Sequence, residues 1–372
     1  MQGPVGRGAL TMRALFLVQY PPQAASTRFR VTQFFSFLEE NGVSCRLASL
    51  LTPAQFGEFY QSGQRASKAA RLLFGAVRQT VEALGARRFD VVVVQRGALL
   101  FGPPLLEWLV ARVGRVPLVF DFDDAIWLQD PSTSWGPLAR AAKFPSKVAD
   151  IVKMARHVIV CNGYTRDYAL RLRSPDAVTV IPTVVDADQF HPVARPRGSH
   201  PIVGWIGTHS TAQYLGEIAE PLREAAAATK FTLKIVGAGR DVRIPGVSVV
   251  NKPWSLAEEV SDYQSLDIGL YPVRDDAWGR GKTGFKPIVY MSCGVACIAS
   301  PVGGVTEFIS HDANGLLASS PTEWRDALIS LVADHELRQR LGAAGRETVV
   351  DGYSLQAQAP RLLKVLREAA IR

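Results

Sequence analysis

Short apolar runs alternate with segments of helical periodicity along most of this chain, and that alternation most constrains its fold. The clearest run, Asp90 to Gln95, contains four consecutive valines, which is typical of a strand buried on both faces. Further strands are predicted at Arg13–Gln19, Ser44–Leu50, Pro117–Asp121 and His157–Cys161, and helices at Thr27–Asn41, Gln64–Leu84, Leu105–Val113 and Lys147–Arg156. This order predicts a parallel sheet with helices on both faces.

A proline-rich segment with little periodicity, residues 182–201, interrupts the pattern and is interpreted as a linker. A second series then follows: Ile202–Ile206, Ala212–Ala227, Thr232–Val236, Val247–Val250, Ile268–Tyr271, Pro287–Cys293, Ala296–Ser300 and a helix-rich tail from Pro321. The sequence therefore predicts an α/β protein of two doubly wound parallel-sheet domains. Ligands of such sheets bind beyond the carboxyl ends of the strands, so we expect a site in a cleft that the two domains face.

Composition supports an ordinary enzyme of two domains. The 372 residues are 47% hydrophobic and 20% charged, and no apolar stretch reaches the roughly 18 residues that span a bilayer. The four cysteines (Cys45, Cys161, Cys293 and Cys297) match neither a disulfide framework nor a zinc pattern. The expected compartment is the cytoplasm.

Charge is concentrated in the first half of the chain. Residues 1–190 contain 22 Lys and Arg against 15 Asp and Glu, a net +7, whereas the remainder contains 20 against 19, a net +1. Such a bias favours anionic partners. The basic helix at residues 64–88 could rest on an anionic membrane, although the sequence favours a solvated helix face. No aromatic-rich sheet or zinc pattern indicates nucleic-acid binding.

Three turns in the second half combine glycine with a following helix. Gly207-Thr208-His209 opens the turn after the strand Ile202–Ile206, where backbone N–H groups could bind phosphate or Ser210 or Thr211 could simply cap a helix. Gly303 and Gly304 let the backbone approach a ligand, and Glu307 could accept hydrogen bonds from sugar hydroxyls or only favour the helix dipole.

The second of these turns gives the strongest indication of a ligand site in the chain. Its sequence is Arg280-Gly281-Lys282-Thr283-Gly284-Phe285-Lys286-Pro287. Proline suits the first turn of a helix, so Lys282 and Lys286 cluster at that helix's N-terminus. Two cations beside a helix N-terminus repel its dipole unless an anion lies between them. A diphosphate ligand is therefore predicted, with a solvated basic loop as the alternative.

The first half carries two polar clusters at strand ends. Asp121, Asp123 and Asp124 follow the strand Pro117–Phe120, where they could hold a metal, act as a base or pair with arginine. A strand that ends in Asp-x-Asp also raises a rival class, a Mg-dependent phosphohydrolase using Asp121 and Asp123. Arg28 and Arg30 lie near the first helix start, where they could bind an anion or form a plain surface pair.

Taken together, these segments resemble the GT-B glycosyltransferases of family 4, the glycosyl transferases group 1. The resemblance extends over nearly the whole chain from Met12 and is carried by STRFR, FDFDDAIW, VIPTVVDADQFHP, IVGWIGTHST, LKIVGAG, NKPW, SLDIGLYP, GKTGFKPIVYMSCG, ASPVGGVTEFI and HDANGLL. It implies an acceptor-binding Rossmann-like domain at 12–190, a nucleotide-sugar-binding one at 200–355, and a helix at 356–372 that returns to the first domain.

The resemblance also implies roles for single residues. Those expected to bind the donor are Gly207, Thr208, His209, Trp254, Lys282, Thr283, Lys286, Gly303, Gly304 and Glu307. Those expected on the acceptor side are Arg28, Arg30 and Asp121, and those expected to act in catalysis are Lys282, Lys286, Asp123 and Asp124. No bound metal and no cofactor besides the nucleotide-sugar co-substrate are implied.

The implied reaction is retaining transfer of a sugar to a hydroxyl acceptor, such as a cell-surface glycan, a lipid-linked sugar or a metabolite. The basic first half suits a lipid-linked or anionic acceptor and peripheral contact with the inner face of the membrane. One departure stands out. Family members commonly carry two glutamates eight positions apart, which would fall at Gly281 and Val289 here, and neither is acidic. A catalytically inactive nucleotide-sugar-binding protein is therefore an alternative.

Overall fold

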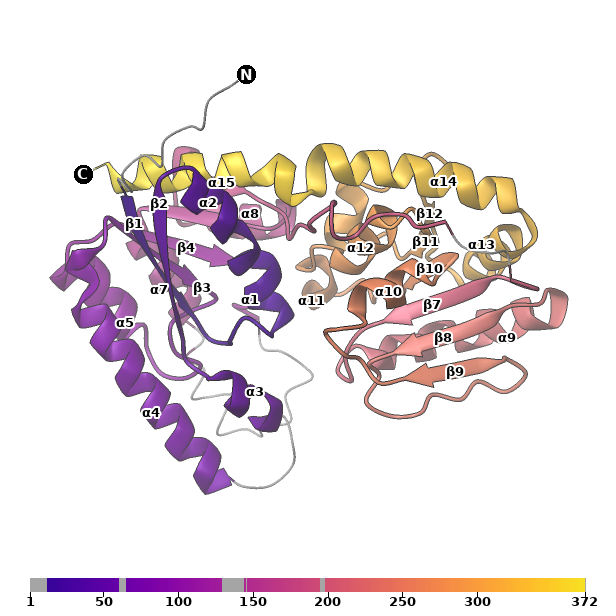
Figure 1. Cartoon of the computed structure of the whole chain (residues 1–372), viewed down its shortest axis with the longest axis horizontal. Coiled ribbons are helices and arrows are strands. Elements are labelled where there is room, and N and C mark those ends of the chain that lie inside the picture. The colour runs from indigo at the N-terminus through magenta and orange to yellow at the C-terminus, as the bar shows by residue number, and fades with distance from the viewer. Residues whose placement is uncertain (1–11, 60–64, 129–143, 145, 195–197, 372) are drawn as a thin grey trace, which may run out of the picture. The chain divides into compact units, whose positions relative to one another are not determined.

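The computed structural model describes residues 12–59, 65–128, 144, 146–194 and 198–371. The chain divides into two compact units (Figure 1). Unit 1 comprises residues up to Pro182 together with Ala359–Arg372, and unit 2 comprises Thr183–Gln358. Each unit is built on its own sheet.

The sheet of unit 1 is wholly parallel and has the strand order β2-β1-β3-β4-β5-β6. Its strands are β1 (Met12–Val18), β2 (Val43–Ser49), β3 (Val91–Gln95), β4 (Leu118–Phe122), β5 (His157–Val160) and β6 (Val178–Val180). The order reverses between β1 and β3, because β2 lies on one side of β1 and all later strands lie on the other. A doubly wound sheet binds ligands at such a switch point, beyond the carboxyl ends of the strands.

Helices cover both faces of this sheet (Figure 1). They are α1 (Ala25–Arg30), α2 (Phe35–Glu40), α3 (Pro53–Phe59), α4 (Arg65–Leu84), α5 (Leu105–Trp108), α7 (Lys147–Met154), α8 (Gly163–Leu170) and α15 (Leu355–Ala370). The single helix predicted at Thr27–Asn41 is wrong, since the backbone of Val31 leaves the helical region and a 3-10 turn separates α1 from α2. Helices α3 and α8 were not predicted.

Both faces of the central strands are buried, as the valine run indicated. Alternate residues of β3 point to opposite faces, so Val92 and Val94 pack against α5 and α7 while Val91 and Val93 face the other layer. On that other face, the ring centroid of Phe16 from β1 lies 5.0 Å from that of Phe35 in α2. Packing on both faces therefore fixes the position of the residues at the carboxyl edge of the sheet.

Unit 2 contains a second parallel sheet of order β12-β11-β10-β7-β8-β9. Its strands are β7 (Ile202–Ile206), β8 (Thr232–Val236), β9 (Val249–Lys252), β10 (Ile268–Tyr271), β11 (Ala296–Ala299) and β12 (Leu316–Leu317). Counted within the unit, this is the strand order of dinucleotide-binding sheets, 3-2-1-4-5-6 read from the β9 edge, and its switch point lies between β7 and β10. The prediction of two doubly wound parallel-sheet domains is confirmed.

The helices of unit 2 are α9 (Ala219–Ala228), α10 (Glu259–Gln264), α11 (Ala277–Arg280), α12 (Phe285–Ser292), α13 (Pro321–Ala333) and α14 (His335–Thr348). The α-helix predicted from Ala212 is partly wrong, because Ala212–Ile218 is a 3-10 helix and α9 begins only at Ala219. The anion-binding dipole expected directly after the turn at Gly207 is therefore weaker than in an α-helix.

The predicted linker does not lie loosely on the surface. Val184, Val185 and Phe190 are fully buried within unit 2, and the Phe190 carbonyl accepts a hydrogen bond of 2.6 Å from Ser292 Oγ. Helix α15 begins in unit 2 and then lies in unit 1, where Arg367 donates to the Asn41 carbonyl at 2.8 Å. None of the described helices is both long and apolar enough to cross a membrane.

Candidate functional site

Lys286 lies at the switch point of unit 2. Its Nζ is 5.5 Å from the ring centroid of Trp205 on β7 and 5.5 Å from that of Tyr271 at the end of β10. These are the two strands between which the order of the sheet reverses. An aromatic face attracts an ammonium group without cancelling its charge. The structure thus presents a cation at the place where such a sheet binds its ligand.

Tyr290 explains why Lys286 is held there. Its hydroxyl accepts a hydrogen bond of 3.1 Å from the Ile206 amide and donates one of 3.4 Å to the Leu270 carbonyl, so it ties α12 to β7 and β10. The Tyr290 ring also fills the space beside Gly269, where a Cβ atom would lie 2.4 Å from it. Lys286 is one turn earlier on the same helix face and is therefore directed to the carboxyl ends of both strands.

The loop that carries Lys282 packs against the double-glycine turn. The Gly304 amide donates to the Lys282 carbonyl at 2.9 Å. Gly303 has a φ of +64°, and a Cβ there would lie 2.6 Å from the Lys282 carbonyl oxygen. Only glycine fits this close approach of two backbones. The Lys282 loop and the Gly303-Gly304 turn, which are apart in the sequence, are thus neighbours in the structure. Lys282 Nζ lies 5.3 Å from the Trp278 ring centroid.

Further residues predicted to bind the donor lie together at the ends of β7, β8 and β9. A Cβ on Gly237, the residue after β8, would lie 2.3 Å from the Gly207 carbonyl oxygen and 3.1 Å from Trp254 Cβ. A Cβ on Gly239 would lie 3.0 Å from His209 Cβ. Trp254 is 39% exposed, and its Nε1 donates to Glu259 Oε1 at 3.3 Å.

Three further predicted residues differ in exposure. Thr208 is exposed, and its hydroxyl lies 3.0 Å from Ser210 Oγ within the turn. Glu307 is exposed at the end of the 3-10 helix Gly303–Glu307. Thr283 is buried, and its hydroxyl lies 3.5 Å from Thr183 Oγ1. Thr283 therefore helps to fix the loop that carries Lys282.

In unit 1, Arg30 and Asp121 form a buried ion pair. Arg30 Nε donates to Asp121 Oδ1 at 3.1 Å and Nη2 contacts Oδ2, while Nη1 donates to the Ile181 carbonyl at 2.6 Å. Their side chains are 2% and 7% exposed, so neither offers much surface to a substrate. Arg28 is half-buried, and its guanidinium lies 4.3 Å from the ring centroid of Phe29.

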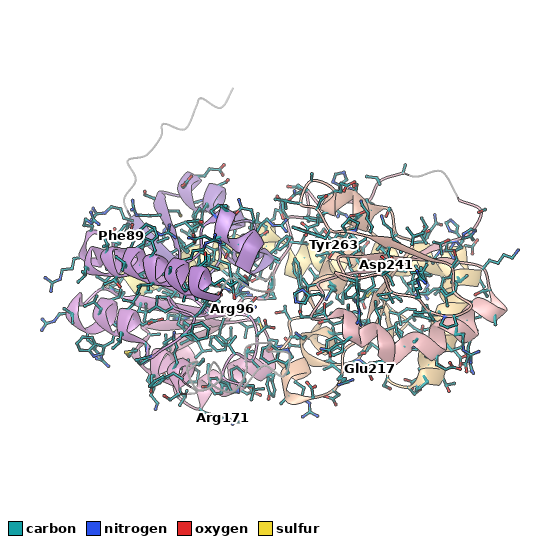
Figure 2. The ribbon with its side chains drawn as sticks, turned by 90° about the horizontal axis from the view of Figure 1, so that it is seen from below. Phe89, Arg96, Arg171, Glu217, Asp241 and Tyr263 are labelled. Carbon is teal, nitrogen blue, oxygen red and sulfur yellow. The ribbon has the colours of Figure 1, made fainter. Side chains whose placement is uncertain are left out.

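Arg96 is a candidate functional residue that sequence reasoning missed. It follows β3 at the switch point of unit 1, at the opposite end of that strand from Phe89 (Figure 2). Its Nε donates to Asp123 Oδ1 at 2.6 Å and its Nη2 to Asp124 Oδ2 at 2.5 Å. The available signal was its position, directly after the buried valine run.

Each of the three aspartates, Asp121, Asp123 and Asp124, forms an ion pair with an arginine. Burial alone would raise the pKa of Asp123, yet Arg96, helped by Arg30, holds that pKa below its usual range. Burial alone would lower the pKa of Arg96, but Asp123 and Asp124 outweigh it and raise that pKa. Within the described part of the chain, no group of three or more His, Cys, Asp or Glu side chains could hold a metal ion.

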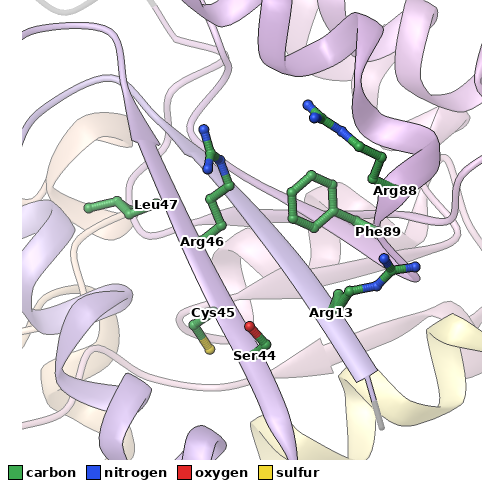
Figure 3. A pocket seen from close by; sticks show the side chains of 7 residues that line it. All are labelled: Arg13, Ser44, Cys45, Arg46, Leu47, Arg88 and Phe89. Carbon is green, nitrogen blue, oxygen red and sulfur yellow. The ribbon is translucent and has the colours of Figure 1, made fainter. Parts of the chain in front are cut away.

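A surface hollow of about 560 Å3 lies elsewhere in unit 1 (Figure 3). It is lined by Arg13, Ser44, Cys45, Arg46, Leu47, Arg88 and Phe89. Arg13 and Ser44 lie near the amino ends of β1 and β2, at the edge of the sheet opposite to the switch-point site. Two of its guanidinium groups already face carboxylates, since Arg13 Nε is 3.9 Å from Asp90 and Arg46 Nε donates to Glu82 at 3.0 Å.

Solved structures show which fold this is. The glycosyltransferase from Rickettsia africae ESF-5 superposes with a TM-score of 0.69 at 14% identity, over 97% of this chain and 99% of that one. HepE from Anabaena in complex with UDP-glucose gives 0.61 at 14% identity, over 96% and 100%. The chain therefore has the GT-B fold.

Sequence comparisons point the same way. Residues 200–334 match the family model described as glycosyl transferases group 1. The alpha-maltose-1-phosphate synthase of Mycolicibacterium smegmatis is 25% identical over 256 residues, which are 59% of this chain. The aligned region spans 65% of that relative, just under two thirds of its length. These findings confirm the resemblance that the motifs indicated.

Proposed function

We propose that this protein is a glycosyltransferase that moves a sugar from a nucleotide-diphosphate donor to a hydroxyl acceptor. The observation that carries the proposal is Lys286 at the β7/β10 switch point, beside the N-terminus of α12 and close to the loop of Lys282. A helix N-terminus and ammonium groups both attract phosphate. Gly284 precedes α12 and provides no side-chain cap, unlike Asn162 before α8.

The donor would lie along the carboxyl edge of unit 2. In this arrangement Lys282, Lys286 and the α12 N-terminus bind the diphosphate, and the backbone of Gly207, Gly303 and Gly304 allows its close approach. The exposed ring of Trp254 suits a stacked base, and Thr208, His209, Thr283 and Glu307 complete the proposed donor contacts. A UDP-sugar is the first donor to test, because HepE binds UDP-glucose.

The resemblance to group 1 glycosyltransferases supports a retaining reaction. The bond from the sugar anomeric carbon to the donor phosphate oxygen breaks, and a bond to the acceptor oxygen forms on the same face. The acceptor proton passes to the leaving phosphate oxygen, whose developing charge Lys282 and Lys286 stabilise. No metal enters this scheme, because the lysines and the helix dipole supply the positive charge. NMR of the anomeric proton in the product would test retention.

We place acceptor recognition in unit 1. Asp124 is partly exposed and is oriented by Arg96, so it and Asp123 are the groups that could orient an acceptor hydroxyl. The buried pair of Arg30 and Asp121 would act by fixing that edge. The basic first half suits an anionic or lipid-linked acceptor and work at the inner face of the membrane.

A second candidate function is nucleotide-sugar binding without transfer. It is favoured by one observation, the absence of acidic residues at Gly281 and Val289. A binding protein would show affinity for a nucleotide sugar with neither transfer nor hydrolysis. The comparisons give no support to the phosphohydrolase alternative, and Asp121 and Asp123 both face arginines.

The test begins with thermal-shift measurements across UDP-, GDP-, ADP- and dTDP-sugars to find the donor. Donor affinity is then measured by calorimetry for Lys282→Ala/Lys286→Ala, with the exposed Lys230→Ala as matched control. Each lost charge-assisted hydrogen bond is worth about 1.5–3 kcal/mol, so we expect affinity to fall about tenfold or more. Unchanged affinity in the double variant would overturn the site, and normal binding without transfer would favour the binding protein.

A further inference from the structure

Helix α4 turns its large apolar side chains to solvent. Leu73, Phe74, Val77, Val81 and Leu84 are 68%, 64%, 56%, 59% and 65% exposed. Their spacing places them within one arc of the helix, since residues three and four apart lie on the same face. An exposed apolar stripe of this size marks an interaction surface.

The packed face of α4 carries polar side chains beside Ala83, which is 2% exposed and lies in the core of unit 1. Gln79 is fully buried and its Nε2 donates to the carbonyls of Val18 and Ala48, at 3.0 and 2.9 Å. Glu82 is 9% exposed and accepts from Arg46. The helix is thus held by these hydrogen bonds and by Ala83, and none of the five stripe residues belongs to the core cluster of unit 1. Core packing therefore does not explain why these exposed positions are apolar.

Helix α5 and the helical turn that follows it, Leu109–Val113, also expose apolar side chains. Leu105 and Trp108 are 61% and 50% exposed, and Val113 is 45% exposed. Helices α4 and α5 are in contact and lie side by side in unit 1 (Figure 1). Trp108 adds an amphipathic ring of the kind that favours the interface between lipid and water.

The charges around this surface are positive. Residues 67–88 and 105–115 contain the cations Lys68, Arg71, Arg78, Arg87, Arg88, Arg112 and Arg115. Of these, Arg78 donates to the Ser49 and Leu50 carbonyls on the packed side, and Arg88 also lines the hollow described above. The same two segments contain only two acidic residues, and both are buried: Glu82 is 9% and Glu107 is 1% exposed. Glu107 instead accepts a hydrogen bond of 2.8 Å from the Ala98 amide. The surface therefore presents apolar side chains among cations, without an exposed carboxylate in these segments.

We infer that the α4/α5 surface docks onto a lipid bilayer that contains anionic headgroups. Apolar side chains enter the boundary between headgroups and acyl chains, while Lys and Arg face the phosphates. A second copy of the chain fits less well, because pairing two such faces would oppose like charges. The inference deepens the membrane contact in the proposed function, but it uses none of the donor residues.

Flotation of the full chain with vesicles tests the inference without any nucleotide sugar. We expect binding to phosphatidylcholine vesicles that contain phosphatidylglycerol and much weaker binding to phosphatidylcholine alone. Phe74→Ser/Val77→Ser/Val81→Ser should weaken binding by at least about tenfold, because three side chains no longer enter the bilayer. The matched control is Val250→Ser/Val350→Ser, which changes valines 50% and 42% exposed in unit 2. It should bind as the unchanged chain does.

A second arm separates charge from apolar contact. Arg88→Gln/Arg112→Gln should weaken binding to the anionic vesicles and reduce its sensitivity to salt. Equal binding of the triple serine variant and the unchanged chain would overturn the inference, as would equal binding to neutral and anionic vesicles. Self-association that the triple variant abolishes, with no vesicle binding, would assign the surface to a second copy.

The two proposals fail separately. Lys282→Ala/Lys286→Ala should lose donor affinity and still float with anionic vesicles. The triple serine variant should keep donor affinity and its thermal unfolding midpoint, because its substituted side chains are more than half exposed. A triple variant that unfolds at a much lower temperature would show that α4 needs its stripe for folding, which contradicts the docking role.

Discussion

The carboxyl edges of the two sheets hold their charged residues against different kinds of partner. In unit 1, Asp121, Asp123 and Asp124 each meet an arginine from another element, and the pair of Arg30 and Asp121 is almost fully buried. In unit 2, Lys286 lies against the rings of Trp205 and Tyr271. Ion pairs neutralise charge, and aromatic faces attract a cation through their quadrupole. The first edge is therefore held by ion pairs, and the second presents Lys286 beside two aromatic rings.

The two edges also differ in what holds their loops in place. Gly303 permits the loop of Lys282 to lie against the double-glycine turn. In unit 1, side-chain ion pairs hold the aspartates at the edge. Substitutions should therefore affect stability most in unit 1 and ligand binding most in unit 2.

The largest expected effect on stability is that of Asp121→Asn. It removes the charge paired with buried Arg30 and leaves that guanidinium only the weaker attraction of Asp123, which should cost about 3–5 kcal/mol of unfolding free energy. Urea unfolding followed by hydrogen exchange of amides in β4 would measure it. The double variant Arg30→Met/Asp121→Leu removes the whole pair and should cost less. A loss below about 1 kcal/mol for Asp121→Asn would show that the pair is not a structural element of that edge.

A smaller effect is expected in unit 2 for Gly303→Ala. The positive φ and the contact with the Lys282 carbonyl should together cost about 1–3 kcal/mol and weaken donor binding. Gly102→Ala is the matched control, since Gly102 has a φ of +80° and open space around its Cβ position. Gly102→Ala should lower the unfolding free energy through backbone strain alone and should leave donor affinity unchanged. Equal effects on donor affinity would refute the role given to the Gly303 contact.

The smallest expected effect is the response of Asp123 to acid. Its folded-state pKa is lowered, so its ionised form stabilises unit 1 above the ordinary aspartate pKa of about 4. This contribution is lost as the pH falls through the lowered folded-state pKa. The stability difference between the unchanged chain and Asp123→Asn, measured by urea unfolding, should therefore shrink toward acid pH. A difference that grows as the pH falls would reverse the assigned sign.

The apolar runs were sufficient to predict the sheets. The structure has strands with the predicted bounds at residues 202–206, 232–236 and 268–271. A buried strand is a short continuous apolar run, and the segments on either side of it lack such a run. Helix α8 was missed, since its start depends on the cap from Asn162 rather than on a long apolar pattern. The break at Val31 depends on tertiary packing that local spacing does not encode.

The site was predictable where a motif concentrates charge and not where partners are distant in sequence. The lysines of GKTGFK stand out in the sequence, but their placement over Trp205 and Tyr271 depends on Tyr290. Arg96 lies 27 residues before Asp123, and a lone arginine after a strand gives no sign of its partner. The apolar stripe of α4 was hidden for the same reason, because spacing alone does not tell which face of a helix packs.

The most direct test of the central claim is a crystal structure of the chain with its preferred nucleotide-diphosphate sugar bound. We expect the diphosphate to lie at the carboxyl ends of β7 and β10, in contact with Lys286 and the backbone near Gly207. A diphosphate bound at the carboxyl edge of unit 1, or in the hollow beside Arg46, would contradict it.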